Sequence, residues 1–132
     1  MQQYVQFICS NAKVVNEDAL ALEPDAGIFV TADGPTRPTR ADGTYPAVEG
    51  IIAPHIFTRT IASWLVNTTY TGHTCLQPSM ALAWSEANNR IADENKLRSL
   101  DTLTDEDFMY QDCLSTVGQA LWLPTAQTTP PY

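Results

Sequence analysis

Proline and glycine positions in the segment 16–34, NEDALALEPDAGIFVTADG, constrain the fold of this chain more than any other feature of its sequence. Residues 18–23 alternate small and large side chains up to Pro24, which has no N–H to donate to a strand ladder and therefore ends an extended run. Residues 27–34 form a further strand-like run that is bounded by glycine at both ends. Residues 4–9, YVQFIC, also combine β-branched and aromatic residues. The sequence therefore predicts an N-terminal β-hairpin of residues 4–9 and 18–23, followed by a third strand.

The middle of the chain gives a weaker signal. Residues 34–50 contain three prolines and three glycines, which predicts a loop. Residues 51–66 alternate weakly, as a strand would, although some of their apolar residues also fit helical spacing imperfectly. The β-branched residues at 58–61 favour the strand. We therefore expect residues 4–66 to be mainly strands.

The C-terminal part favours helices. Residues 78–98 combine a bulky–small alternation with apolar residues at helical spacing, which leaves 78–84 open as strand or helix and predicts a helix over 85–98. Residues 104–121 begin with a threonine N-cap and three acidic residues in the first turn, so we expect a helix there, with 122–132 as an extended tail. The apolar face of this helix would carry Tyr110, Leu114, Val117 and Leu121.

Composition limits the class of protein. A chain of 132 residues that is 44% hydrophobic and 17% charged suits one globular domain, 1–132. The net charge of −8, with only two lysines, argues against broad charge-driven binding of nucleic acid. No apolar run is long enough for a membrane span and no signal peptide is visible, so an intracellular protein is expected. Three cysteines without a C-x-x-C pair make a structural zinc site improbable.

No sequence motif supplies a self-sufficient active site. The chain has no P-loop, no G-x-G-x-x-G, no H-E-x-x-H and no G-x-S-x-G. His55 and His73 are interpreted as ordinary polar residues. We therefore predict no catalytic residue and no cofactor, and no metal site in the leading interpretation.

An alternative interpretation assigns a metal site to three acidic residues. Strands that each end near a carboxylate can bring Glu17, Asp18 and Asp33 together, and Mg²⁺ or Mn²⁺ prefers such oxygen ligands. Here the chain resembles the N-terminal half of the metal-dependent PPM (type 2C) phosphatases. That family has an Asn-Glu-Asp-type segment, then a strand running into Ala-Asp-Gly, then helices, one with an Ala-Asn pair. This chain has NED at 16–18, ADG at 32–34 and AN at 87–88, but Pro35 and its neighbours replace the glycine-rich continuation of the family.

The chain also resembles the coat proteins of small single-stranded RNA bacteriophages, in length and pattern. YVQFICSNAKVVNEDALALEP looks like their opening hairpin, IFTRTIASW and SMALAWSEA like central strands, and ADENKLRSL and TDEDFMYQDCLSTVGQALWLP like their helical end. The resemblance implies dimers that interlock their helices over a shared sheet. The shared core would comprise Tyr110, Leu114, Val117, Leu121 and Trp122. It also implies RNA contacts on an exposed sheet face, for which Thr58, Arg59 and Thr60 are the candidates.

The leading prediction is therefore an α+β fold: an N-terminal β-hairpin and antiparallel sheet, followed by C-terminal helices and completed by dimerisation. The expected function is that of a self-assembling structural protein, a phage coat protein rather than an enzyme. Its expected partners are further copies of itself and genomic RNA, without a membrane. Its expected location is the virion, after assembly in the host cytoplasm. The alternative is a PPM-type phosphatase half-domain or pseudoenzyme.

Overall fold

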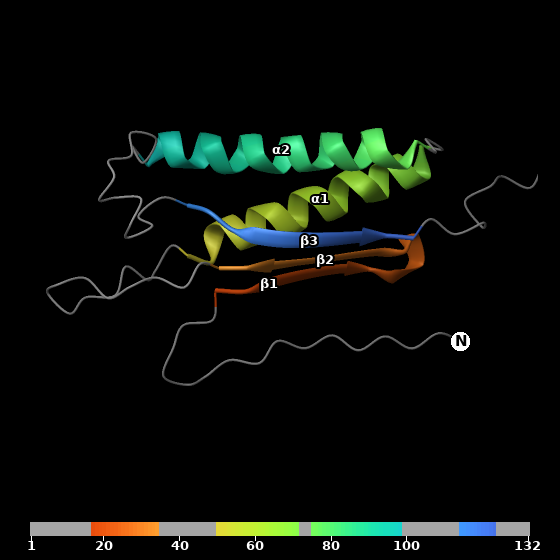
Figure 1. The fold of residues 1–132 in the computed structure, drawn as a ribbon, viewed down its shortest axis with the longest axis horizontal. Coiled ribbons are helices and arrows are strands. Elements are labelled where there is room, and N and C mark those ends of the chain that lie inside the picture. Colours follow the sequence, from red (N-terminus) through yellow and green to blue (C-terminus); the bar gives the residue numbers. More distant parts are fainter. Residues whose placement is uncertain (1–16, 35–49, 72–74, 99–113, 124–132) are drawn as a thin grey trace, which may run out of the picture.

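A three-stranded sheet and two long helices make up the described part of the chain. The computed structural model describes residues 17–34, 50–71, 75–98 and 114–123. Helix α1 packs on one face of the sheet and against α2, so that it lies between the sheet and α2 (Figure 1). The α+β class with an antiparallel sheet is confirmed. The elements are β1 (Ala19–Glu23), the short 3-10 helix η1 (Pro24–Ala26), β2 (Ile28–Asp33), α1 (Ile52–Tyr70), α2 (Leu76–Leu97) and β3 (Val117–Trp122).

The predicted strands on either side of Pro24 are confirmed, and they pair with each other. Strand β1 ends at Glu23, directly before the proline, and β2 runs antiparallel to it with Ala19 opposite Ala32. Gly27 makes the turn with a φ of 70°, the left-handed conformation that glycine adopts without steric cost. The predicted strand 4–9 and its hairpin lie outside the described residues.

Strand β3 corrects the prediction of a helix over 104–121. The N-terminal part of the predicted helix, 104–113, lies outside the described residues. Val117–Trp122 is a strand that pairs antiparallel with β2. Residues of β3 alternate between the outer face and the α1 side of the sheet, with burial rising to Trp122 at its end. The physical reason is that residues 117–121 also alternate large and small side chains with a period of two, which suits a strand at the free edge of β2. The helical spacing of the apolar residues was coincidental.

Helix α1 corrects the prediction of a strand over 51–66. The β-branched residues are accommodated because Thr58 and Ile61 are fully buried, so packing against the sheet outweighs their low helix propensity. Several threonine hydroxyls donate to main-chain carbonyls one turn earlier, as Thr69 does to Leu65 at 2.8 Å. This internal hydrogen bonding keeps the hydroxyls satisfied inside a helix.

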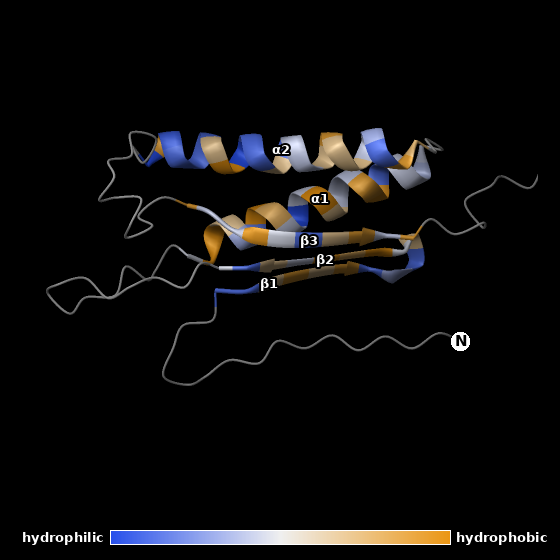
Figure 2. Ribbon diagram, in the orientation of Figure 1, coloured by the Kyte–Doolittle hydropathy of each residue, from blue (hydrophilic) through white to orange (hydrophobic). Residues whose placement is uncertain are grey.

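Helix α2 confirms the predicted helix over 85–98 and extends it back to Leu76, so residues 78–84 are helical. Its buried residues, Ser79, Ala83 and Ala87, are small and four apart, which lets α1 approach closely along one stripe. Two pairs at i,i+4 spacing, Glu86–Arg90 and Glu94–Arg98, lie on its more polar sides. Figure 2 shows the hydrophilic colouring of the C-terminal half of this helix.

The core lies between the sheet and the two helices. Ile28 and Val30 of β2 meet Ile61 and Leu65 of α1 there, and all four are fully buried. Phe57 packs edge-on against Trp84 of α2, with ring centroids 4.8 Å apart and an interplanar angle of 84°. Figure 2 shows hydrophobic colouring over much of β1 and β2 and over parts of α1. The core thus buries one face of the sheet, and the residues that alternate with it on β2 and β3 face the other side.

Candidate metal site at the open end of the hairpin

The open end of the β1–β2 hairpin carries the acidic residues singled out in the sequence. Ala19 is opposite Ala32, so continuing the same register by one and two residues places Asp18 opposite Asp33 and Glu17 opposite Gly34. The start of β1, the end of β2, the start of β3 and the first turn of α1 all lie at this end of the molecule, at the left of Figure 1. The antiparallel register is therefore what gathers residues far apart in the sequence.

Asp18 and Asp33 face each other directly. Both residues are exposed, and their side chains are hydrogen-bonded to each other. This hydrogen bond, together with partial desolvation and the negative charge of Asp18, raises the pKa of Asp33 above its ordinary value. Two carboxyl groups in contact can share one proton, and a divalent cation satisfies the same pair of oxygens without a proton.

Glu17 lies at the same end but on the α1 side of the sheet. Its side chain is only 7% exposed, and it is packed between two glycines. A Cβ at Gly34 would overlap with the Cβ of Glu17, and a Cβ at Gly50 would overlap with its carboxyl group. At Gly34 the overlap is with the Cβ and the main chain of Glu17, so only glycine fits there, whereas at Gly50 the overlap is with the carboxyl group at the end of the Glu17 side chain. Gly50 lies two residues before α1, which begins at Ile52 and whose N-terminal dipole favours a nearby negative charge.

The structure therefore brings two of the three predicted ligands into contact. Consecutive residues of an extended chain point to opposite faces, which separates the side chain of Glu17 from that of Asp18. Accordingly, within the described ranges no three His, Cys, Asp or Glu side chains are gathered closely enough to hold a metal ion. The pair Asp18–Asp33 is the part of the predicted site that this geometry supports.

The predicted RNA-contact residues are not on a sheet. Thr58, Arg59 and Thr60 lie on α1, where Thr58 and Thr60 are 1% and 5% exposed and only Arg59 is exposed to solvent. The prediction assumed a strand, on which alternation would put Thr58 and Thr60 on one outward face. It was wrong, because these residues are part of a helix. On the helix, both threonines turn into the protein instead.

The predicted dimer-interface residues separate into two groups. Leu114 and Trp122 are buried within this chain, at 3% and 8% exposure, so their side chains already have a core. Val117 and Leu121 are 75% and 53% exposed and lie on the outer face of β3. Tyr110 lies outside the described residues. These residues do not form the single helical face that the sequence suggested.

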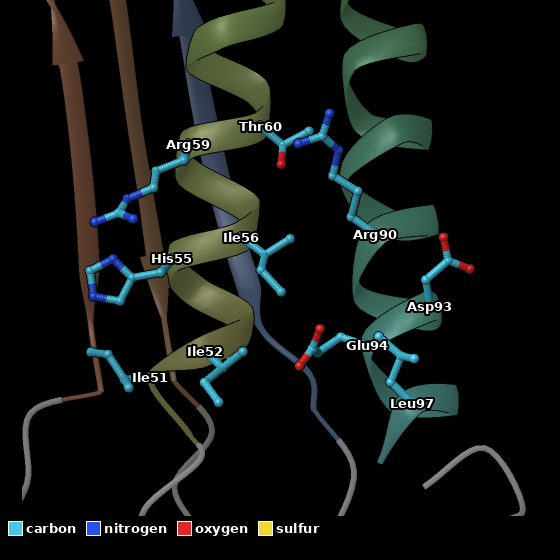
Figure 3. Close-up of a pocket in the computed structure, with 10 residues that line it drawn as sticks. All are labelled: Ile51, Ile52, His55, Ile56, Arg59, Thr60, Arg90, Asp93, Glu94 and Leu97. Atoms are coloured by element: carbon cyan, nitrogen blue, oxygen red, sulfur yellow. The ribbon is translucent and has the colours of Figure 1, made fainter. Parts of the chain in front are cut away.

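A groove of about 620 Å³ lies between the first half of α1 and the end of α2. In Figure 3, Ile52 and Ile56 point toward α2, whereas His55 and Arg59 project from the other side of α1. Arg90, which lines the groove, is paired with Glu86 at 3.0 Å. The groove is on the α1 side of the sheet, so it does not open onto the Asp18–Asp33 pair. It had no signal in the sequence, because its residues come from two helices that the sequence left unresolved.

The remaining sequence candidates give no further site. His55 is partly exposed on α1, and Cys75 is an exposed free thiol at the start of α2. His73, Cys9 and Cys113 lie outside the described residues. None of the helices that the structure describes is both long and apolar enough to cross a membrane.

Comparisons with known proteins identify no relative of this chain, so its function has to be inferred from its own residues. No protein-family model matches the sequence, and neither the curated proteins nor the solved structures gave a match.

Proposed function

We propose that this chain corresponds to the N-terminal half of a PPM-type, metal-dependent phosphatase domain and that it binds a divalent cation between Asp18 and Asp33. The order of its elements supports the proposal. An Asn-Glu-Asp segment leads into β1, β2 runs into Ala32-Asp33-Gly34, and two helices follow, the second carrying Ala87-Asn88. This is the order that the resemblance to that family requires.

The observation that carries the proposal is the hydrogen bond between the side chains of Asp33, the last residue of β2, and Asp18, the residue just before β1. When both carboxyl groups are ionised, their like charges repel each other across the end of the strand pair, unless a proton is shared between them. A divalent cation with oxygen ligands turns this repulsion into attraction. When bound, such an ion supplies Lewis acidity, which lowers the pKa of a bound water and polarises a phosphate ester.

Replacement of Asp33 by asparagine tests the proposal. Two unit charges 4 Å apart in water interact by about 1 kcal/mol, so one carboxylate contributes about 2 kcal/mol to a divalent cation, or about 30-fold in Kd. We therefore expect Asp33→Asn to weaken Mn²⁺ binding by about 30-fold, measured by isothermal titration calorimetry on the full chain. Its thermal stability without metal should not fall, since the substitution removes a like-charge contact.

The matched control is Asp25→Asn. Asp25 is exposed in η1, at the opposite end of the hairpin, and Asp25→Asn changes the net charge by the same amount. It should bind Mn²⁺ as the wild-type chain does. Absence of saturable Mn²⁺ binding by the wild-type chain, or equal weakening by both substitutions, would reject the site. Mn²⁺-dependent hydrolysis of p-nitrophenyl phosphate that Asp33→Asn abolishes would extend the result from binding to catalysis.

A self-assembling structural protein is the second candidate, and a different observation favours it. The exposed side chains of Val117 and Leu121 lie four residues apart on the outer face of β3, with Gln119 between them, and Leu121 is opposite Phe29 of β2. An apolar outer face of this kind is suited to association with a second copy. The double substitution Val117→Thr, Leu121→Thr should then shift the chain from dimer to monomer in size-exclusion chromatography with light scattering. A wild-type chain that elutes as a monomer would rule the second candidate out.

A further inference from the structure

Strand β3 is an edge of the sheet that carries no charge. The strand order is β1-β2-β3, so within the described ranges β2 is the only strand beside β3. Residues 114–123, LSTVGQALWL, contain neither a charged residue nor a proline, in a chain whose net charge is −8. The other edge strand, β1, has the exposed acidic residues Asp18 just before it and Glu23 at its end. Charges and prolines are what usually keep a sheet edge from pairing with another chain, so β3 is the edge that is open to pairing.

The free edge of β3, on the side away from β2, presents main-chain donors and acceptors. The Leu123 N–H donates to the Gly27 carbonyl, which is opposite it when the β2–β3 register continues by one position. Bonded and non-bonded positions alternate along an antiparallel pair, so the main-chain groups of Gln119 also point to β2. Those of Gly118 and Ala120 therefore point to the free edge.

The pattern of β3 is self-complementary about Gln119. The small residues Gly118 and Ala120 flank it, and the larger apolar residues Val117 and Leu121 lie one position farther out on either side. We propose that two copies of this chain pair β3 with β3 in antiparallel orientation, about a two-fold axis at Gln119, so that their sheets join into one. Gly118 then exchanges both main-chain hydrogen bonds with the partner's Ala120, and Val117 lies opposite the partner's Leu121 on the outer face.

Helix α2 offers a further surface to the added strand. A Cβ at Gly118 would overlap with the ring of Phe57, and that ring packs edge-on against Trp84 of α2. Helix α2 lies on the β3 side of the molecule and not on the β1 side (Figure 1), and Trp84 is 41% exposed. A strand at the free edge of β3 lies next to this indole ring and covers it. Tryptophan is enriched at the buried centre of protein interfaces, where it contributes much of the binding energy.

This inference rests on the second candidate function, association with a second copy, and it does not depend on the cation site. It specifies pairing at an edge, in which the outer faces of the two sheets lie side by side. Association through the outer faces themselves would instead stack one sheet on the other. Thr31 separates the two arrangements, because it is exposed on the outer face of the central strand β2, opposite Gln119. A lysine there is buried by stacking, whereas edge pairing leaves it in solvent.

The first test measures the dimer dissociation constant of the full chain by sedimentation equilibrium. Ala120→Pro removes an N–H that points to the free edge, and it leaves the ladder between β2 and β3 complete. It should raise the Kd of the dimer about 30-fold, since each copy loses one main-chain hydrogen bond to the other. Thr31→Lys is the control and should leave the Kd within about twofold of wild type.

The second test uses opposite charges at the proposed axis. Gln119→Lys and Gln119→Glu each place two like charges opposite each other, so either variant alone should dimerise more weakly than wild type. An equimolar mixture places lysine opposite glutamate, and it should form a mixed dimer about tenfold tighter than either variant forms with itself. This rescue requires that residue 119 of one copy faces residue 119 of the other.

The outcomes distinguish edge pairing from association in general. A wild-type chain that stays monomeric overturns this inference together with the second candidate function, and leaves the cation site untouched. A wild-type dimer that Thr31→Lys dissociates and Ala120→Pro does not is a stacked dimer, which overturns edge pairing alone. Equal dimerisation of the Gln119 variants alone and in mixture overturns the axis at Gln119. Should Ala120→Pro not fold, the mixture of the two Gln119 variants decides.

Discussion

Gly118→Val is expected to destabilise the protein by about 3 kcal/mol, at the upper end of the usual effect of overpacking a core. Gly118 lies opposite Ala32, and a Cβ at this position would overlap with the ring of Phe57. That ring cannot swing aside, because Phe57 is buried and packs edge-on against Trp84. Small domains have a total stability of about 5–15 kcal/mol, so a large part of it would be lost. Chemical denaturation followed by tryptophan fluorescence measures the effect.

A double-mutant cycle isolates the cause. Phe57→Leu alone should destabilise the protein, because it removes buried contacts with Trp84. In the Gly118→Val background the same change should cost less, or restore stability, since it makes room for the new side chain. Gln119→Val is the positional control, because Gln119 is exposed on the outer face of the same strand. Additive effects of the substitutions at positions 57 and 118 would show that the overlap is not the cause.

Gly27→Val is expected to destabilise the protein by about 4 kcal/mol. Gly27 has a φ of 70°, and a non-glycine residue in that conformation costs about 1–2 kcal/mol, more when it is β-branched. A Cβ would also overlap with the main-chain carbonyl of Leu123. Since the Leu123 N–H donates to the Gly27 carbonyl at 2.7 Å, separating the two segments would also lose about 1 kcal/mol of hydrogen bonding.

Comparison with two other residues at position 27 separates strain from overlap. Asn tolerates the left-handed conformation better than Val does, but it brings the same Cβ overlap. Gly27→Asn should therefore recover about 1 kcal/mol relative to Gly27→Val, whereas Gly27→Ala should lie between them. The midpoints of urea denaturation give this order. A Gly27→Val protein as stable as wild type would mean that the turn does not have this geometry.

The hairpin could be predicted from sequence because local chemistry determines it. Pro24 ends β1, Gly27 turns the chain and the alternation of β2 matches its one-sided burial. The contact between Asp18 and Asp33 follows from the same register, so these two site residues were within reach of sequence analysis. The position of Glu17 on the other side was implied by the alternation as well, although the sequence interpretation treated the three carboxylates as one group.

The remaining elements could not be predicted because tertiary packing decides them. The threonines and isoleucines of α1 have strand-like propensities, and only their burial against the sheet and α2 makes the helix favourable. Strand β3 pairs with residues far away in sequence: Val117 is 84 positions from its partner Asp33. Gly118 favours neither a helix nor a strand locally. The hydrogen bonds from Asn95 to Leu114 and from Thr116 to the Asp33 carbonyl could not be predicted for the same reason, since their partners are 19 and 83 residues away in sequence.

The four-residue connection from Pro24 to Gly27 sets which residues meet at the opposite end of the hairpin. Inserting or deleting a single residue there, without a bulge to absorb it, would slide one strand past the other by one position. The aspartates would then no longer be cross-strand neighbours, and the apolar residues of one strand would turn from the core to solvent. An indel of two residues would preserve the inside and outside of each strand but would still re-pair Asp18. Length variation in this short connection is thus coupled, about five residue pairs away, to whether Asp18 and Asp33 face each other.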